Sequence, residues 1–123
     1  MANSHGTFCW HELAASNHDE CIDFYSRLIG WETKQSNIGD TNYTEFLVDG
    51  KPVGGVEHVD GDEGRPGRWR VYLTVDDVDA VCANAVKLGG KVISQPHDLP
   101  SVGRLATIED PSSAQLSLVS FPK

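Results

Sequence analysis

An internal repeat constrains the fold of this chain more than any single motif does. Residues 12–35 align without a gap with residues 72–95, at a constant offset of 60 residues. Five pairs of residues are identical at this offset: Leu13/Leu73, Asp19/Asp79, Leu28/Leu88, Gly30/Gly90 and Gln35/Gln95. Both copies also show the same order of a strand, a capped helix, a glycine and a second strand. Because the period is long and there are only two copies, the repeat predicts a duplicated module and not a solenoid.

The first copy has the sequence signals of a βαβββ module. A strand is predicted over residues 6–14, and Ser16-Asn17-His18-Asp19 resembles a capping box at the start of a helix. Strands are predicted over residues 31–36, 43–48 and 52–59, with Asp49-Gly50 as a hairpin turn. The helix has an apolar stripe of Cys21, Ile22, Tyr25, Leu28 and Ile29, and Gly30 suits its end.

The second copy repeats this order. Asp76 is predicted to cap its helix, and Gly89-Gly90 to end it. Strands are predicted over residues 69–75, 91–95, 104–109 and 114–121, with an irregular segment over 96–103 and a turn over 110–113. The acidic residues 60–67 lack the closing glutamate and the flanking helices of a calcium loop, so they are predicted to form a solvated linker.

Composition narrows the possible partners of the chain. Its 123 residues include 10 Lys and Arg against 18 Asp and Glu, for a net charge of −8. This charge argues against binding to nucleic acid or to an anionic membrane, because both attract clustered Lys and Arg. We see no apolar run long enough to span a bilayer, and residues 1–7 lack the features of a signal peptide. The odd number of cysteines without CxxC spacing indicates reduced thiols, so we expect a cytoplasmic protein.

Several short motifs resemble those of the vicinal oxygen chelate superfamily, in its glyoxalase, bleomycin-resistance and dioxygenase-like branch. They are Cys9-Trp10-His11-Glu12-Leu13, Phe24-Tyr25, Gly30-Trp31, Lys51-Pro52-Val53-Gly54-Gly55, Val75-Asp76-Asp77-Val78-Asp79-Ala80, Leu88-Gly89-Gly90-Lys91-Val92 and Glu109-Asp110-Pro111. The resemblance covers nearly the whole chain and implies an α+β fold, in which two tandem βαβββ modules form a curved mixed-sheet groove flanked by helices. We expect a single domain over residues 1–123, with modules 6–59 and 69–121 joined by linker 60–68.

By the resemblance, the family's four metal-ligand positions fall on Trp10, Glu57, Arg70 and Ser117. Trp10 and Arg70 are 60 residues apart, and so are Glu57 and Ser117, which agrees with the offset of the repeat. A divalent ion in such a site requires imidazole and carboxylate ligands, and of these four residues only Glu57 is one. We therefore predict no ordinary metal site and no cofactor.

His11 and His58 each lie one residue away from a ligand position. Because side chains alternate along a strand, both should face away from the groove if Trp10 and Glu57 face into it. Leu13 supports this facing, since it belongs under the helix on the same face as His11. A register slip of one residue would reverse the assignment and bring His11, His58 and Glu12 toward the groove.

The groove is predicted to be an aromatic small-molecule pocket, lined by Trp10, Arg70, Tyr72 and Ser117. The alternative is a filled groove in which Trp10 and Tyr72 are core residues. We also predict an ion pair between Glu57 and Arg70 in the place of the metal, because a buried carboxylate needs a partner. If Glu57 lacks this partner, burial would make it a candidate general base, with Glu12 as the second candidate.

Two functions fit these residues. The first is a glyoxalase-like protein that binds a small molecule without metal catalysis. The alternative is a lyase or isomerase that uses Glu57 or Glu12 as its base, with no metal or an unusual one. A weaker third possibility is a regulatory subunit whose partner surface matters more than its groove. Because the chain is small, we also expect it to form a homodimer.

Overall fold

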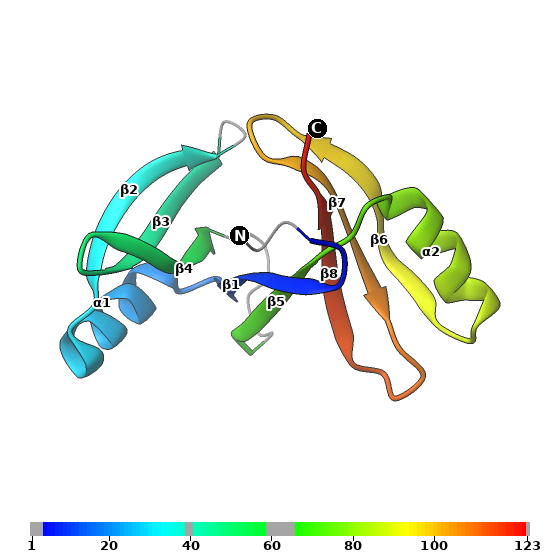
Figure 1. The fold of residues 1–123 in the computed structure, drawn as a ribbon. Helices are drawn as coiled ribbons and strands as arrows, with labels where there is room; N and C mark the ends of the chain where they lie inside the picture. The colour runs from blue at the N-terminus through cyan, green and yellow to red at the C-terminus, as the bar shows by residue number, and fades with distance from the viewer. Residues whose placement is uncertain (1–3, 39–40, 59–65, 123) are drawn as a thin grey trace. The chain divides into compact units, whose positions relative to one another are not determined.

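The computed structural model describes residues 4–38, 41–58 and 66–122. Two βαβββ modules follow each other along the chain (Figure 1), and the predicted α+β fold class is confirmed. The first module consists of β1 (Thr7–Ala15), α1 (His18–Ile29), β2 (Glu32–Ile38), β3 (Thr41–Val48) and β4 (Lys51–His58). The second consists of β5 (Arg68–Thr74), α2 (Val78–Lys87), β6 (Lys91–Leu99), β7 (Gly103–Glu109) and β8 (Gln115–Ser120). No helix in the described part of the chain is long and apolar enough to cross a membrane.

The chain divides into two compact units. One unit is His11–Arg70, and the other combines Met1–Trp10 with Val71–Lys123. Within the first unit the strands follow the order β2-β3-β4-β1, and within the second they follow β5-β8-β7-β6. The pairs β1–β4 and β5–β8 are parallel and the hairpin pairs are antiparallel, so the sheet is mixed.

The core of the His11–Arg70 unit lies between its strands and α1. Its buried residues are Leu13, Ala15, Phe46 and Val56, with Cys21, Ile22, Tyr25 and Trp31 packed against them. Leu13 therefore faces the helix, as predicted. The predicted apolar stripe of α1 is only partly correct, because Leu28 and Ile29 remain exposed. No residue of α1 is fully buried, which shows that this helix makes only a shallow contact with its sheet.

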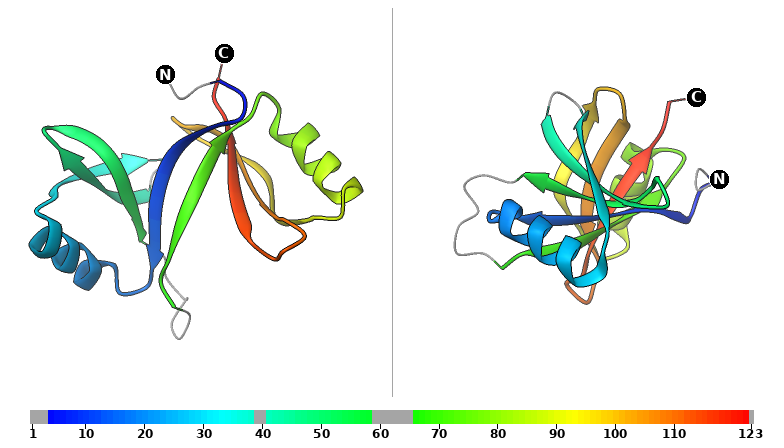
Figure 2. Two further views of the ribbon diagram at one scale, coloured as in Figure 1. Left: turned by 60° about the horizontal axis from the view of Figure 1, so that its bottom comes forward. Right: turned by 90° about the vertical axis from the view of Figure 1, so that its left-hand side faces the viewer.

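In the other unit, α2 is docked more deeply. Its residues Val78 and Cys82 are buried in a core with Val75, Ala106 and Leu118. Figure 2 shows α2 alongside β6, next to the meander formed by β6, β7 and β8. Apolar residues at helical spacing thus produce a buried helix face in this unit.

Both predicted helix caps need correction. The α2 helix is capped by Asp77, whose side chain accepts a hydrogen bond from the backbone N–H of Ala80 at 3.1 Å. Asp77 has the extended backbone of a cap residue, whereas Asp76 is exposed and lies near His5. At α1 the predicted capping box does not form, because the cap residue Asn17 makes no side-chain hydrogen bond to the backbone.

The observed hairpin turn and strands agree with those predicted from the sequence, except at segment 96–103. Asp49 and Gly50 both have positive φ angles, of 51° and 77°, as a two-residue hairpin turn of the primed type requires. The exception is segment 96–103, predicted to be irregular, since β6 extends to Leu99. A register shift between Ser94 and His97 lets the strand continue past Pro96, which has no N–H to donate. Residues 60–65 of the predicted linker lie outside the described residues.

Candidate functional site

Two carboxylates and one guanidinium meet within the His11–Arg70 unit. Arg70 on β5 donates from Nη1 to Glu57 on β4, at 2.6 Å. The same nitrogen lies 3.5 Å from a carboxylate oxygen of Glu12 on β1. The predicted ion pair between Glu57 and Arg70 is therefore present, and Glu12 joins it. We call these three residues the Arg70 cluster.

Strand alternation explains why these side chains share one face. In the parallel pair β1–β4, Glu12 lies opposite Gly55 and Ala14 lies opposite Glu57. Residues two positions apart on a strand point to the same side, so Glu12 and Glu57 project together. Leu13 and Val56 project to the other side, where they belong to the core under α1. The sheet of this unit thus has a polar face and an apolar face.

The Arg70 cluster is largely withdrawn from solvent. The side chain of Glu12 is 7% exposed, that of Arg70 is 28% and that of Glu57 is 35%. A carboxylate as buried as Glu12 is stable in its charged form only when a positive group is close. One guanidinium faces two carboxylates, so the cluster has a formal charge of −1.

The Tyr43 side chain lies on the same face of the sheet as the Arg70 cluster. It is 5% exposed and lies opposite Glu57 in the antiparallel pair β3–β4. A Cβ atom at Gly55 would collide with the ring and hydroxyl of Tyr43, so this ring occupies the space of a missing side chain. Gly55 is the strand neighbour of Glu12, which places the Tyr43 phenol on the cluster's face. A glycine inside a strand was the sequence signal for this close approach.

The two histidines next to the ligand positions do not join the cluster. The ring of His58 stacks on His18 of α1, with centroids 3.9 Å apart, and its Nε2 lies 3.3 Å from the Thr44 hydroxyl. His58 therefore faces the helix, as alternation predicts. His11 is exposed and follows the parity of Leu13, away from Glu12.

The residues of the Arg70 cluster do not fit the family's metal. A divalent ion needs several imidazole or carboxylate ligands and no competing positive charge. Here a guanidinium lies between the two carboxylates. In the described ranges 4–38, 41–58 and 66–122, no group of three or more His, Cys, Asp or Glu residues is arranged to hold a metal ion.

The remaining predicted ligand-binding residues lie in the other unit. Tyr72 and Ser117 are partners in the parallel pair β5–β8, so their side chains share a face. Ser117 is 5% exposed, and its hydroxyl lies 3.1 Å from that of Thr107. Trp10 and Tyr72 are partly buried. The structure thus brings Glu12, Glu57 and Arg70 together in one unit, and Tyr72 and Ser117 together in the other.

The predicted equivalence of Glu57 and Ser117 is wrong by two residues. Glu57 lies opposite Ala14, and the repeat relates Ala14 to Thr74. Thr74, however, lies opposite Val119 and not Ser117. The structural counterpart of Glu57 is therefore Val119. Register depends on the bulges and turns of each hairpin, and β3–β4 has a register shift after Phe46.

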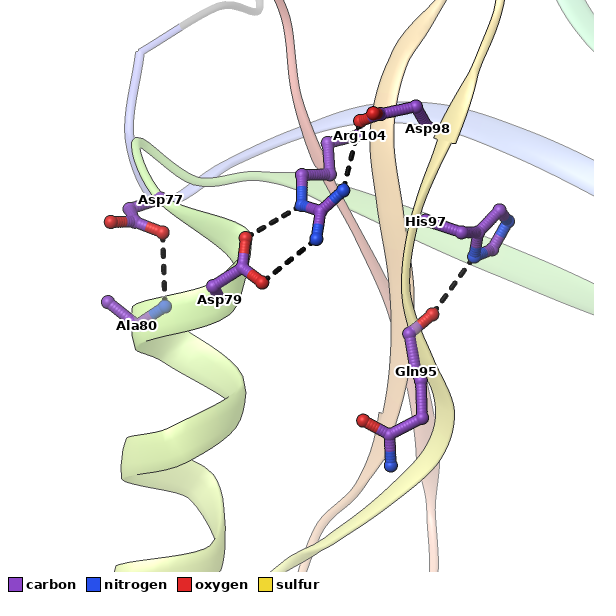
Figure 3. A network of polar contacts seen from close by, with 7 residues as sticks. All are labelled: Asp77, Asp79, Ala80, Gln95, His97, Asp98 and Arg104. Atoms are coloured by element: carbon purple, nitrogen blue, oxygen red, sulfur yellow. Dashed lines mark hydrogen bonds and ion pairs between the residues drawn. The ribbon is translucent and has the colours of Figure 1, made fainter.

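A second arginine cluster lies on the surface of the other unit (Figure 3). Arg104 donates two hydrogen bonds to Asp79 of α2, at 2.7 and 3.0 Å, and one to Asp98 of β6, at 3.0 Å. The hydrogen bonds from Arg104 hold the pKa of Asp79 below its ordinary value of 3.8. The two aspartates in turn raise the pKa of Arg104, mainly through these hydrogen bonds. We call these residues the Arg104 cluster. It ties the first turn of α2 to the β6–β7 hairpin.

Comparison with known proteins is consistent with this architecture. Residues 10–119 match the model of the family described as "Glyoxalase-like domain". The chain belongs to the glyoxalase-like domain family. The chain is 37% identical over 120 residues to "Putative glyoxylase CFP32" of Mycobacterium tuberculosis, covering 97% of this chain and 46% of that protein. It is 33% identical to "Anthracycline biosynthesis protein DnrV" of Streptomyces peucetius, covering 92% of this chain and 46% of that protein. The chain therefore spans about half the length of these relatives.

Solved structures of the glyoxalase-like fold are also similar to this chain. Methylmalonyl-CoA epimerase from Mycobacterium tuberculosis matches with a TM-score of 0.64 and 16% identity, over 100% of this chain and 93% of that one. A Streptomyces coelicolor methylmalonyl-CoA epimerase in complex with 2-nitronate-propionyl-CoA matches with a TM-score of 0.67 and 15% identity, over 98% and 100% of the two chains. At these identities the likeness shows the fold alone.

Proposed function

We propose that this chain is a small-molecule binding protein whose site works without the ordinary metal of its family. The observation that carries the proposal is the position of Arg70, 2.6 Å from Glu57 and 3.5 Å from Glu12. The guanidinium supplies the positive charge that two neighbouring carboxylates require. It also repels a divalent cation from the same oxygens. The cluster is therefore suited to fixing a polar group of an organic ligand and not to binding a metal ion.

The proposed ligand is an aromatic organic molecule with a few polar groups. Small-molecule sites are mostly apolar, with a small number of polar side chains that fix orientation. Trp10, Tyr72 and Ser117 are the proposed ligand-binding residues of one unit, and Arg70 is that of the His11–Arg70 unit, where Tyr43 adds a buried phenol on the face of the cluster. The name of the relative DnrV concerns anthracycline biosynthesis, and an aromatic ligand for this chain is in keeping with that name.

Metal analysis combined with a fluorescent probe tests the proposal. The protein is purified without chelator, reloaded with zinc, nickel, manganese or iron, dialysed, and measured by elemental analysis. We expect no stoichiometric metal. The aromatic probe 1-anilinonaphthalene-8-sulfonate should bind equally well with and without EDTA. Trp10→Ala and Tyr72→Ala should weaken probe binding, whereas Val86→Ala, an exposed change on α2, should leave it unchanged. Retention of one metal ion per chain would refute the proposal. A probe affinity that Trp10→Ala and Tyr72→Ala leave unchanged would also refute it.

A second proposal is a lyase or isomerase without a metal. The condition for Glu57 as the general base was the lack of a charged partner, and it is not met, because Glu57 is paired with Arg70 at 2.6 Å. Glu12 has the longer contact and is the more buried of the two carboxylates, so it is the better candidate for the base. Incubation of small carbonyl compounds in D₂O, followed by NMR, would detect proton exchange. Exchange that Glu12→Gln abolishes while probe binding persists would favour this enzyme over the binding protein.

A further inference from the structure

A polar hollow spans strands β2, β3 and β4 on the side that faces α1. Its volume is about 310 Å³, and it is lined by Gln35 and Ser36 of β2, Asn42 of β3 and His58 of β4. All four residues belong to the His11–Arg70 unit. Small-molecule pockets usually have volumes of about 300–1,000 Å³, so the hollow has the size for a small ligand. We call it the β2–β4 hollow.

The β2–β4 hollow and the Arg70 cluster lie on opposite faces of the same strands. Thr44 on β3 lies opposite Val56 on β4, and Val56 is a core residue under α1. Asn42 is two positions from Thr44, and His58 is two positions from Val56, so all four side chains point to the face of α1. Glu57 directly precedes His58 and points to the other face. A ligand in the hollow would therefore not contact the Arg70 cluster.

Hydrogen bonds hold two of the lining side chains in place. The hydroxyl of Thr44, a residue that is 1% exposed, donates to Oε1 of Gln35 at 3.3 Å. Nε2 of His58 lies 3.3 Å from the same hydroxyl oxygen. Because the hydroxyl proton goes to Gln35, Nε2 of His58 is the donor in the second bond, which fixes the tautomer of the imidazole. Side chains that are already fixed lose little entropy when a ligand binds.

The His58 ring is also held from the side of α1. It stacks on the His18 ring, with centroids 3.9 Å apart and an angle of 10° between the ring planes. Nδ1 of His18 is buried and has no hydrogen-bond partner within residues 4–38, 41–58 and 66–122. Buried polar atoms without a partner are rare in folded proteins. Polar side chains kept at a cost in stability are typical of a functional site.

The fold itself does not require polar residues at these positions. The repeat relates His18 to Val78, which is 1% exposed in the core under α2. In the observed registers of β3–β4 and β7–β8, Thr44 corresponds to Ala106, which is also a core residue. The same positions are thus apolar in the other unit. The polar character of the β2–β4 hollow is therefore a property of the His11–Arg70 unit and not of the βαβββ module.

We propose that the β2–β4 hollow binds a small uncharged polyol of the size of a monosaccharide. The carboxamides of Gln35 and Asn42 and the imidazole of His58 each both donate and accept hydrogen bonds, as every hydroxyl of a polyol does. None of the four lining residues carries a fixed charge, so a charged ligand would lack a partner. The net charge of −8 further disfavours an anion. Of the four, only His58 is of a type that binds metal ions, so the hollow does not suit a metal ion.

NMR titration of the isotope-labelled full chain with D-glucose, D-ribose and myo-inositol tests this proposal. At least one polyol should cause saturable shifts confined to signals around the hollow, including the side-chain amides of Gln35 and Asn42. Asn42→Ala should raise the dissociation constant of that polyol at least about fivefold, because it removes hydrogen bonds to the ligand. Gln35→Glu should have a similar effect, because it removes the amide donors but keeps an acceptor for Thr44.

Gln95→Glu is the matched control, because the repeat relates the exposed Gln95 to Gln35 and the change in charge is the same. It should leave polyol affinity unchanged. All three substituted side chains are exposed, so the unfolding midpoint of each variant should change little. Absence of saturable shifts with all three polyols would overturn the proposal. Equal weakening by Gln95→Glu, or binding of adenine or acetate at least as tight as that of the polyol, would also overturn it.

This inference and the proposed function can fail independently. Asn42→Ala and Gln35→Glu should leave binding of 1-anilinonaphthalene-8-sulfonate unchanged, because the hollow and the Arg70 cluster lie on opposite faces. Trp10→Ala and Tyr72→Ala belong to the other unit and should leave polyol binding unchanged. Loss of polyol binding in these two variants would overturn the assignment of the polyol to the β2–β4 hollow.

Discussion

Two arginines in this protein each lie between two carboxylates, but in different surroundings. Arg70 contacts Glu57 and Glu12, and the Glu12 side chain is 7% exposed. Arg104 contacts Asp79 and Asp98, whose side chains are 56% and 80% exposed. The Arg104 cluster has the better hydrogen-bond geometry, with a bidentate contact to Asp79. Geometry alone would therefore rank the Arg104 cluster first.

Burial reverses this ranking. Water solvates the exposed aspartates whether or not Arg104 is present, so ion pairs of this kind contribute little to stability. Water has little access to the buried Glu12 carboxylate, so removal of Arg70 would leave its negative charge in a region of low dielectric constant. A folded protein gains little from such a buried cluster compared with apolar packing. The Arg70 cluster is therefore the better indication of a functional site, and the Arg104 cluster is a structural tie between α2 and its hairpin.

The largest expected effect comes from breaking the buried cluster. Arg70→Leu should lower the free energy of unfolding by about 2 kcal/mol, because it leaves Glu12 without its positive partner. Urea denaturation at pH 7 measures this change. The triple variant with Glu12→Gln and Glu57→Gln added should recover part of the loss. Arg104→Leu is the matched control, and a loss equal to that of Arg70→Leu would contradict the comparison.

A smaller effect on stability should come from the close contact between Gly55 and Tyr43, next to the Arg70 cluster. Gly55→Ala should cost about 1–2 kcal/mol, because the new methyl group displaces the buried ring of Tyr43. In the Tyr43→Ala background the same substitution should cost much less, since the space is then open. A double-mutant cycle by urea denaturation measures this coupling. Additive costs would mean that Tyr43 does not occupy the space above Gly55.

The smallest effect should come from the Arg104 cluster and should depend on pH. Because Arg104 holds the pKa of Asp79 below 3.8, the ionised pair stabilises the fold above that pH. The contribution is lost as the pH falls through the lower folded value. Thermal unfolding should therefore show a slightly lower Tm for Asp79→Asn at pH 7, and a shrinking difference below about pH 3.8. A Tm difference between the two proteins that persists at pH 2 would refute a role for this ion pair. So would a difference at pH 7 that does not change in 1 M salt.

Most of the local structure was predictable because it depends on short stretches of sequence. Helical spacing and Gly30 indicated α1, and Asp49-Gly50 indicated the β3–β4 turn. Alternation along β1 and β4 placed Leu13 under the helix and His58 away from Glu57. The ion pair between Glu57 and Arg70 was predicted for another reason, because the family resemblance places both residues at neighbouring metal-ligand positions.

Contacts between strands were less predictable, because the same local pattern allows several alignments. The repeat implied that Glu57 corresponds to Ser117, whereas the observed register pairs it with Val119. A shift by two residues preserves the face of every side chain, so no hydrophobic pattern reveals it. The close approach of Tyr43 to Gly55 likewise depends on which residues β3 and β4 bring opposite each other.

The sequence by itself thus determined the α+β fold with its two βαβββ modules, the order of the elements and the facing of most strand residues. These properties follow from periodicity, turn residues and the repeat, which act over a few neighbouring positions. Only the tertiary structure decided that Glu12 shares Arg70 with Glu57, that Tyr43 fills the space above Gly55, and that α1 leaves an apolar patch exposed. Each depends on the distance between residues far apart in the chain, and packing alone sets that distance.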